Sequence, residues 1–236
     1  MRNVVLVDFD GVVLKGNNKL VSNFLNKKVC NYVQRKTCIN NRDLVQVLNN
    51  EVYTSYGHTV LGLKKHNIKA DILEFNSLVY GDLMGMRELK FTREEKDNWV
   101  TFMDEMEQCD LNVQFFSNAP MTWIKHFIGQ DYTDGMFDLM TKISEHRYKH
   151  VNDELLKPER SIYDFVMKEY PRCLYYMLDD KIINFGPVCQ DPRWVKMWVS
   201  GVSDASIKPY SAFFSLSDIV NAADLIQRCE DNINTR

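Results

Sequence analysis

Four short apolar runs, separated by helical segments, are the feature that most constrains the fold of this chain. The first, Val4–Val7, is β-branched and apolar on both alternating faces, as in a buried strand of a parallel sheet. Similar runs return at residues 113–116, 174–178 and 195–199, with a short piece near 212–214. Because strand and helix alternate, the sequence predicts an α/β fold with a Rossmann-like parallel sheet and helices on both faces.

A long stretch between the first and second runs lacks any strand pattern. Its apolar residues recur at helical spacing, as in Leu44, Val47 and Leu48. We therefore expect a helical lobe at residues 16–91, inserted into a core made of residues 1–15 and 92–236. In the core, Thr92 and Glu95 form a capping-box signature, which predicts a helix over 92–108. Later helices are expected at 161–170 and 217–228, and Trp194 and Trp198 are expected to pack in the core.

Composition excludes several classes of protein. The chain has 29 Lys and Arg against 32 Asp and Glu, a net charge of −3, which argues against a general surface for nucleic-acid polymers. No apolar stretch approaches the ~20 residues that span a bilayer, and the run before Asp8 is too short for a secretory signal. The cysteines form no CxxC pair, so we expect free thiols and a cytoplasmic location. They are Cys30, Cys38, Cys109, Cys173, Cys189 and Cys229. The sequence says nothing about oligomeric state.

Reactive polar residues follow three of the predicted strands. They are Asp8 and Asp10 after the first strand, Ser117 and Asn118 after the second, and Asp179 and Asp180 after the third. The carboxyl ends of parallel strands share one edge of a sheet, where ligands commonly bind, so these side chains should gather there. Each pair could instead start a turn or cap a helix, since Asp, Ser and Asn often do both.

Four carboxylates at one edge require a cation among them. Two unit charges 4 Å apart repel by about 4 kcal/mol at an effective dielectric constant near 20. Mg²⁺ suits such a site, because it prefers oxygen ligands and commonly joins one or two carboxylates to a phosphate. Lys157, just ahead of a predicted helix, is the candidate for a second cation, although taken by itself such a residue is more often an ordinary solvated lysine.

Four short sequence motifs occur in order along the chain. They are DFDGVV at residues 8–13, FFSN at 115–118, LKPE around Lys157, and LDDKIIN at 178–184. In this order the chain resembles the haloacid dehalogenase superfamily of Mg²⁺-dependent phosphatases. The resemblance implies a haloacid-dehalogenase-like core and a helical cap between the first and second motifs.

The resemblance also implies catalytic roles, which agree with the chemistry of the side chains. Asp8 would be the nucleophile that forms an aspartyl-phosphate, and Asp10 would be the general acid and base. Ser117 and Asn118 would bind the phosphoryl group of the substrate, and Lys157 would neutralise developing charge.

The metal site implied by the resemblance consists of Asp8, Asp10, Asp179 and Asp180, which would hold Mg²⁺. An acid at position 10 favours phosphate chemistry over dehalogenation, since dehalogenation needs no proton donor there.

The helical stretch resembles the cap of one branch, the pyrimidine 5′-nucleotidases, over residues 56–79. This resemblance implies contacts to a base or ribose from Tyr56, His66, Asn76 and Tyr80. Two segments, 79–83 and 119–123, depart from the branch pattern. The aromatic residues could instead form the core of the lobe, and His66 could be structural.

The sequence therefore predicts a Mg²⁺-dependent phosphomonoesterase that acts on a small phosphorylated metabolite, foremost a nucleoside 5′-monophosphate. A phosphosugar phosphatase or phosphomutase of the same fold is the alternative. A non-catalytic binding module is the third reading, because a fold does not by itself determine a function.

Overall fold

Five parallel strands form one sheet in the order β2-β1-β3-β4-β5. The structure is a computed structural model that describes residues 3–15, 19–82, 89–129, 135–150, 155–199, 214–216 and 219–234. The strands are β1 (Val4–Val7), β2 (Asn112–Phe115), β3 (Tyr175–Asp179), β4 (Trp194–Val199) and β5 (Phe214–Leu216). The predicted α/β fold with a parallel sheet is confirmed.

The strand boundaries differ from the prediction by one or two residues. β2 and β4 each begin one residue earlier than predicted, and β3 begins and ends one residue later. β5 covers Phe214–Leu216, whereas residues 212 and 213 of the predicted strand lie outside the described residues. Apolar patterning locates a strand, but hydrogen bonding to its neighbours sets its ends.

The register of the strands aligns their carboxyl ends. Val7 at the end of β1 pairs with Phe115 on β2 and with Leu178 on β3. The residues that follow these three positions therefore lie at the same edge of the sheet, which is the arrangement predicted for the polar side chains.

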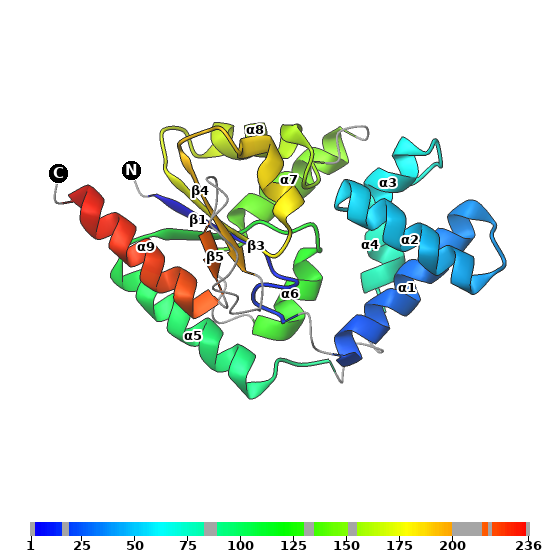
Figure 1. The fold of residues 1–236 in the computed structure, drawn as a ribbon, viewed down its shortest axis with the longest axis horizontal. Helices are drawn as coiled ribbons and strands as arrows, with labels where there is room; N and C mark the ends of the chain where they lie inside the picture. Colours follow the sequence, from blue (N-terminus) through cyan, green and yellow to red (C-terminus); the bar gives the residue numbers. More distant parts are fainter. Residues whose placement is uncertain are drawn as a thin grey trace.

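Helices cover both faces of the sheet (Figure 1). On one face lie α5 (Arg93–Gln108), α6 (Met121–Ile128) and α9 (Ile219–Asn234), which share a core with Val5 and Val7 of β1. On the other lie α7 (Asp138–Lys149) and α8 (Arg160–Glu169), which pack with Val4 and Leu6. A 3₁₀ helix, η1 (Ile182–Val188), follows β3. Because successive residues of β1 point to opposite faces, this strand is buried on both sides.

The predicted helices of the core are confirmed. Thr92 caps α5 in a capping box with Glu95, as the sequence indicated. α8 begins and ends one residue earlier than predicted. α9 extends to Asn234, six residues past the predicted end at 228, and residues 217 and 218 lie outside the described part of the chain.

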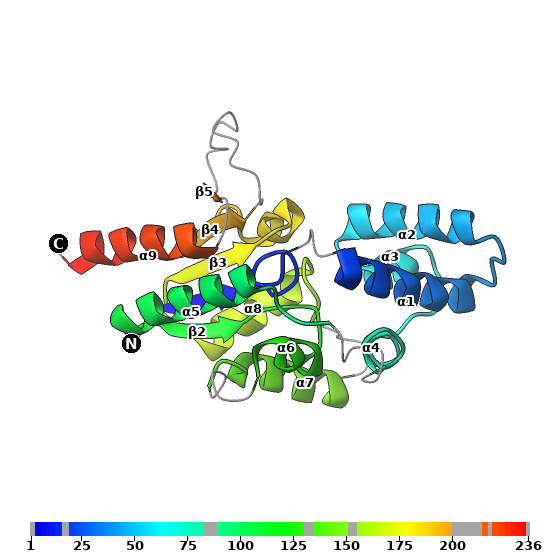
Figure 2. The ribbon, with the colours of Figure 1, turned by 90° about the horizontal axis from the view of Figure 1, so that it is seen from below.

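Four helices form a separate group beside the sheet (Figures 1 and 2). They are α1 (Lys19–Thr37), α2 (Arg42–Tyr56), α3 (Thr59–Lys65) and α4 (Ile72–Tyr80). We call them the helical lobe. They enclose a hydrophobic core of their own, which includes Val33, Val60, Leu63 and Phe75. The predicted absence of strands is confirmed over the described residues 19–82.

The buried face of α2 includes only part of its apolar spacing. Leu44 and Val47 are 57% and 61% exposed, whereas Val45, Asn49 and Val52 are buried. The prediction of a helix was right, and packing against α1 and α3 selects which of its faces is buried.

Two further expectations concern the cysteines and a pair of tryptophans. All six cysteines are free, as predicted. Trp194 is buried in the core as expected, and Trp198 packs against the same cluster. Within the described ranges, no helix combines the length and apolar character needed to cross a bilayer.

Candidate functional site

The first acidic loop leaves β1 directly into the site. Asp8 is 4% exposed, and its Oδ1 accepts a hydrogen bond from the Phe9 backbone N–H at 2.8 Å. Gly11 has φ 90° and lies so close to Asp180 that a Cβ at position 11 would overlap the Asp180 carboxylate. Glycine therefore lets this loop approach the acids that follow β3.

Lys157 lies at the centre of the site, where the loop before α8 positions it. Its Nζ is 2.6 Å from Asp179 Oδ2 and 3.2 Å from Asp8 Oδ2, and the residue is 1% exposed. Burial by itself lowers the pKa of Lys157, but the two carboxylates outweigh that effect and hold the pKa above its ordinary value. Lys157 is therefore a buried ammonium ion shared by two acids from different strands.

Asn118 fixes the backbone at Lys157. The Asn118 amide nitrogen donates to the Lys157 carbonyl at 2.9 Å, and its Oδ1 accepts from the Lys157 N–H at 2.9 Å. Ser117 is buried beside it, and its Oγ accepts from the Ala119 N–H at 3.3 Å. The structure thus places Ser117 and Asn118 next to Lys157, with the Asn118 amide engaged by the backbone.

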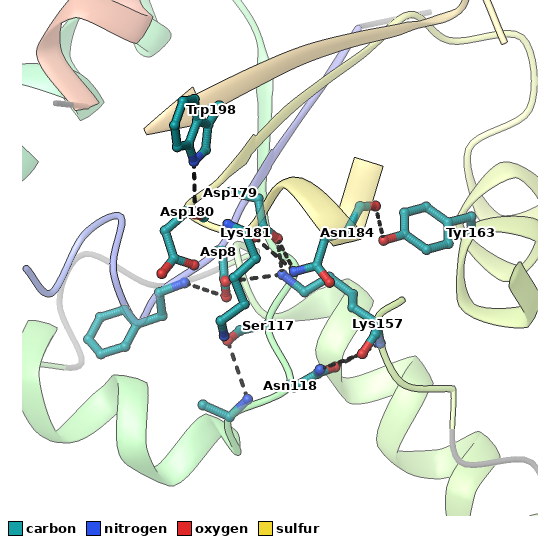
Figure 3. A network of polar contacts seen from close by, with 12 residues as sticks. Asp8, Ser117, Asn118, Lys157, Tyr163, Asp179, Asp180, Lys181, Asn184 and Trp198 are labelled. Carbon is teal, nitrogen blue, oxygen red and sulfur yellow. Dashed lines mark hydrogen bonds and ion pairs between the residues drawn. The ribbon is translucent and has the colours of Figure 1, made fainter. Parts of the chain in front are cut away.

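Asp179 and Asp180 have different surroundings, although they are adjacent in sequence (Figure 3). Both oxygens of buried Asp179 accept hydrogen bonds, from Lys157 Nζ, from the Lys181 N–H at 2.9 Å and from Asn184 Nδ2 at 2.8 Å. Asp180 Oδ1 is buried and has no hydrogen-bond partner within the described residues. Asp180 therefore has an oxygen that is available to bind a ligand, whereas both oxygens of Asp179 are already hydrogen-bonded.

These carboxylates fit a divalent cation. One oxygen each from Asp8, Asp179 and Asp180 lies within 4.8 Å of the others. A hard cation prefers such oxygen donors, and it would satisfy the orphaned Asp180 Oδ1. The side chain of Asp10 is outside this group, and its Oδ1 accepts a hydrogen bond from Trp123 Nε1 at 2.9 Å.

Burial also disfavours the charged forms of two of these acids. It raises the pKa of Asp180 to about 7 and that of Asp10 to about 6, where the hydrogen bond from Trp123 partly opposes it. The lysines nearby favour the charged forms, but burial outweighs them at both acids.

Three residues contribute to the site although sequence reasoning gave them no role. Asn184 binds both oxygens of Asp179, and Tyr163 from α8 donates to the Asn184 carbonyl (Figure 3). Trp198 Nε1 donates to the Asp180 carbonyl at 2.9 Å. The position of Asn184 inside the LDDKIIN motif was an available signal. For Trp198 the available signal was its place near the end of a predicted strand, and the structure pairs it with Asp179.

Lys181 is a further residue without a predicted role, and it joins the site to the helical lobe. Its Nζ lies 4.6 Å from the centroid of the Tyr53 ring on α2. Burial lowers the pKa of Lys181, but Tyr53 and Asp180 raise it well above its ordinary value. The lobe also touches the core at Gly57, where a Cβ would come within 2.8 Å of Pro158 Cδ.

A cavity of about 380 Å³ lies between the core and the helical lobe. Its core side includes Asp8, Asp10, Ser117, Lys157 and Lys181. Its lobe side includes Leu25, Asn26, Val29, Asn49, Asn50, Tyr53, His58, Thr59, Phe75 and Tyr80. The acids and lysines therefore face a cavity whose other wall is mainly uncharged.

The four lobe residues expected to contact substrate lie in different places. Tyr80 lines the cavity. Tyr56 and His66 do not line it, and their rings pack edge to face with centroids 5.9 Å apart. Asn76 borders a second cavity of about 350 Å³, which Ser117 also borders. The structure thus brings only Tyr80 together with the acids, while Tyr53, Asn49 and His58 line the cavity without having been predicted.

Comparisons with known proteins add likenesses of fold. No protein-family model and no curated protein sequence matches the chain. Among solved structures it is similar to a candidate haloacid dehalogenase-like hydrolase from Burkholderia xenovorans LB400, with 12% identity, 97% and 98% of the two chains covered, and a TM-score of 0.49. It is also similar to an L-2-haloacid dehalogenase (12% identity, 96% and 99% covered, TM-score 0.48) and to a candidate beta-phosphoglucomutase from Thermotoga maritima (13%, 96% and 99%, 0.48). Likenesses at this level determine neither the activity nor the substrate of this chain.

Proposed function

We propose that this protein is a Mg²⁺-dependent phosphomonoesterase of the haloacid dehalogenase superfamily, with the helical lobe as its inserted cap. The observation that carries the proposal is the position of Lys157, which lines the cavity and whose ammonium group lies between Asp8 and Asp179. Ser117 and Asp10 border the same cavity. Phosphoryl transfer requires mainly positioning and neutralisation of charge, and these side chains can supply both.

In this mechanism Asp8 attacks the phosphorus atom. A bond forms between a carboxylate oxygen and phosphorus, and the bond from phosphorus to the alcohol oxygen breaks, which leaves an aspartyl-phosphate. The Phe9 N–H holds Asp8 Oδ1, and Asp8 Oδ2 is the oxygen nearest to Lys157.

Asp10 moves the protons. It donates a proton to the departing alcohol and then takes one from the water that hydrolyses the aspartyl-phosphate. Trp123 orients the carboxyl group through its hydrogen bond to Oδ1. The products are the alcohol and inorganic phosphate, and both acids return to their starting state.

Charge on the phosphoryl group is balanced by the residues around it. Lys157 supplies a positive charge and Ser117 a hydroxyl donor. Asn118 acts by holding the Lys157 backbone, because its amide is already engaged there. Asp8 and Asp180, with Asp179 beside them, would hold Mg²⁺, which when bound supplies positive charge to the phosphoryl oxygens.

The substrate that we propose is a small phosphorylated metabolite, foremost a nucleoside 5′-monophosphate. Phe75 and Tyr80 provide aromatic surface on the lobe side of the cavity. A sugar phosphate is the second candidate, because Asn26 and Asn50 offer amides that suit sugar hydroxyls.

A substrate panel tests this proposal. Purified protein is assayed for phosphate release from nucleoside 5′-monophosphates and hexose phosphates, with Mg²⁺ and with EDTA. We expect activity that EDTA abolishes and that Asp8→Asn lowers to background. No release from any member of the panel would overturn the proposal, and unchanged turnover in Asp8→Asn would trace the activity to a contaminant.

A further inference from the structure

Two polar residues line the lobe side of the cavity and are themselves more than nine-tenths buried. Asn49, on α2, is 8% exposed, and His58, immediately before α3, is 7% exposed. Each is held by one hydrogen bond from the lobe itself. The atoms that these bonds leave over are therefore the ones to examine.

Asn49 is fixed through its oxygen. The Thr59 hydroxyl donates to Asn49 Oδ1 at 2.9 Å, and Thr59 is 2% exposed. This bond ties α2 to α3 and determines which end of the amide is free. Across the described residues, none accepts a hydrogen bond from the Asn49 amide nitrogen, so its two N–H groups remain for an occupant of the cavity.

His58 is fixed in the same manner. Its Nδ1 accepts a hydrogen bond from the Val60 backbone N–H at 3.2 Å, as the N-cap of α3. An accepting Nδ1 carries no proton, so the hydrogen of the neutral ring is on Nε2. The edge-to-face contact with Phe75, with centroids 5.0 Å apart, holds the plane of the ring. Burial lowers the pKa of His58 to about 3, so the ring is neutral.

Neither donor is charged, and the lobe side of the cavity has no cation among its described residues. The lysines that line the cavity, Lys157 and Lys181, come from the core and lie beside the acids. A second anionic group beside Asn49 and His58 would lie against neutral donors, because the positive charges that act on His58, those of Lys181 and Arg147, belong to the core and not to the lobe. Burying such a group without a partner is costly.

We propose that Asn49 and His58 are the specificity-determining residues of the helical lobe, donating hydrogen bonds to acceptor atoms on an uncharged leaving group. This inference rests on the proposed function. If Asn49 and His58 have this role, the substrate is a phosphomonoester whose alcohol part is neutral and carries carbonyl, ring-nitrogen or hydroxyl acceptors. This role excludes bisphosphates and phosphorylated carboxylic acids as good substrates.

Steady-state kinetics with three kinds of substrate test the assignment. Uridine 5′-monophosphate and glucose 6-phosphate have neutral leaving groups, fructose 1,6-bisphosphate has a second anion, and acetyl phosphate is too short to reach the lobe. We expect kcat/KM for fructose 1,6-bisphosphate to be at least about 100-fold below that of the better neutral substrate.

The variant Asn49→Asp replaces the amide N–H₂ with an oxygen at nearly the same shape, and His58→Asn removes the ring with its Nε2–H donor and leaves a shorter side chain. Asn at position 58 also retains an acceptor for the N-terminus of α3. Each variant should lower kcat/KM for the better neutral substrate about 10-fold to 100-fold, mainly through KM, and leave acetyl phosphate within about 2-fold. Asn40→Asp makes the same chemical change at an exposed residue of the lobe and serves as the control.

The outcomes separate the two proposals. An equal loss on acetyl phosphate would show that the pair is structural and would overturn the inference, as would unchanged kinetics on every substrate or a preference for fructose 1,6-bisphosphate. Wild-type protein that hydrolyses none of the four compounds would overturn the proposed function, and this inference with it.

Discussion

At the scale of single residues, the site depends on hydrogen bonds that fix one end of a side chain and leave the other end for chemistry. Asn118 holds the backbone of Lys157, and Asn184 holds the carboxylate of Asp179. These contacts determine which polar groups remain available. Asp179 has its oxygens engaged, whereas its neighbour Asp180 has a buried oxygen without a partner in the described chain.

Asn118 provides a test of positioning. Replacing it with Ala removes two hydrogen bonds to the Lys157 backbone, so the ammonium group should lose its fixed place between the carboxylates. We expect kcat to fall about 10-fold to 100-fold with KM nearly unchanged, equivalent to about 1–3 kcal/mol.

Kinetics of Asn118→Asp provide the control for this change. Asp retains an acceptor for the Lys157 N–H and should restore part of the lost kcat. If Asn118→Ala instead raised KM at constant kcat, the amide would be a direct substrate contact.

His58 predicts a dependence of stability on pH. In the folded protein its pKa of about 3 is below the ordinary value of 6.5. Between these two pH values the unfolded chain therefore binds a proton at this residue and the folded chain does not. The stability associated with neutral His58 is complete above pH 6.5 and is lost progressively as the pH falls toward 3. When the pH falls from 6.5 to 5, this residue should lower the unfolding free energy of the protein by about 2 kcal/mol.

Urea unfolding at these two pH values measures the effect. The loss of unfolding free energy from pH 6.5 to pH 5 should be about 2 kcal/mol smaller in His58→Asn than in the wild type. Equal losses in the two proteins would mean that His58 is protonated in the folded state.

At the scale of elements, the helical lobe depends on the close approach of α2 and α3. Gly62 lies against Val52, and a Cβ at position 62 would overlap the Val52 side chain and come within 2.9 Å of its carbonyl oxygen. The same approach brings Thr59 to Asn49. The packing of these two helices therefore sets the wall of the cavity.

Gly62→Ala should separate the two helices. We expect a loss of about 1–3 kcal/mol in unfolding free energy, because overpacking a buried contact forces the backbone to shift. Gly186→Ala is the matched control, since nothing lies within 4 Å of a Cβ built at that position. A chemical denaturation curve for each variant checks this, and equal stabilities would contradict the packing argument.

At the scale of the whole molecule, the site exists because the sheet edge and the helical lobe line the same cavity. Lys181 and Tyr53 meet across this boundary, and Gly57 lies against Pro158. A cation bound by the acids of the folded site would stabilise the entire fold, since the unfolded chain lacks the site.

Thermal unfolding should therefore respond to Mg²⁺. At a Mg²⁺ concentration about 100-fold above Kd, the gain is about 2.7 kcal/mol, which corresponds to a rise in Tm of about 5–10 °C. EDTA should remove the rise, and Asp180→Asn should abolish it. Asp43→Asn, at an exposed acid of α2, should retain it. An equal rise in Asp180→Asn would place the cation elsewhere.

The sequence by itself determined the parallel sheet, the order of its elements and the gathering of acids at one edge. β-Branched apolar runs select buried strands, and parallel strands in register must end together, so Asp8 and Asp179 could be placed side by side without coordinates. Tertiary structure alone decided which helix faces and side-chain ends reach the cavity. α2 turns Asn49 inward and leaves Val47 exposed, and Tyr56 pairs with His66 outside the cavity. The physical reason is that a helix buries whichever face its neighbours cover, and those neighbours are distant in the sequence.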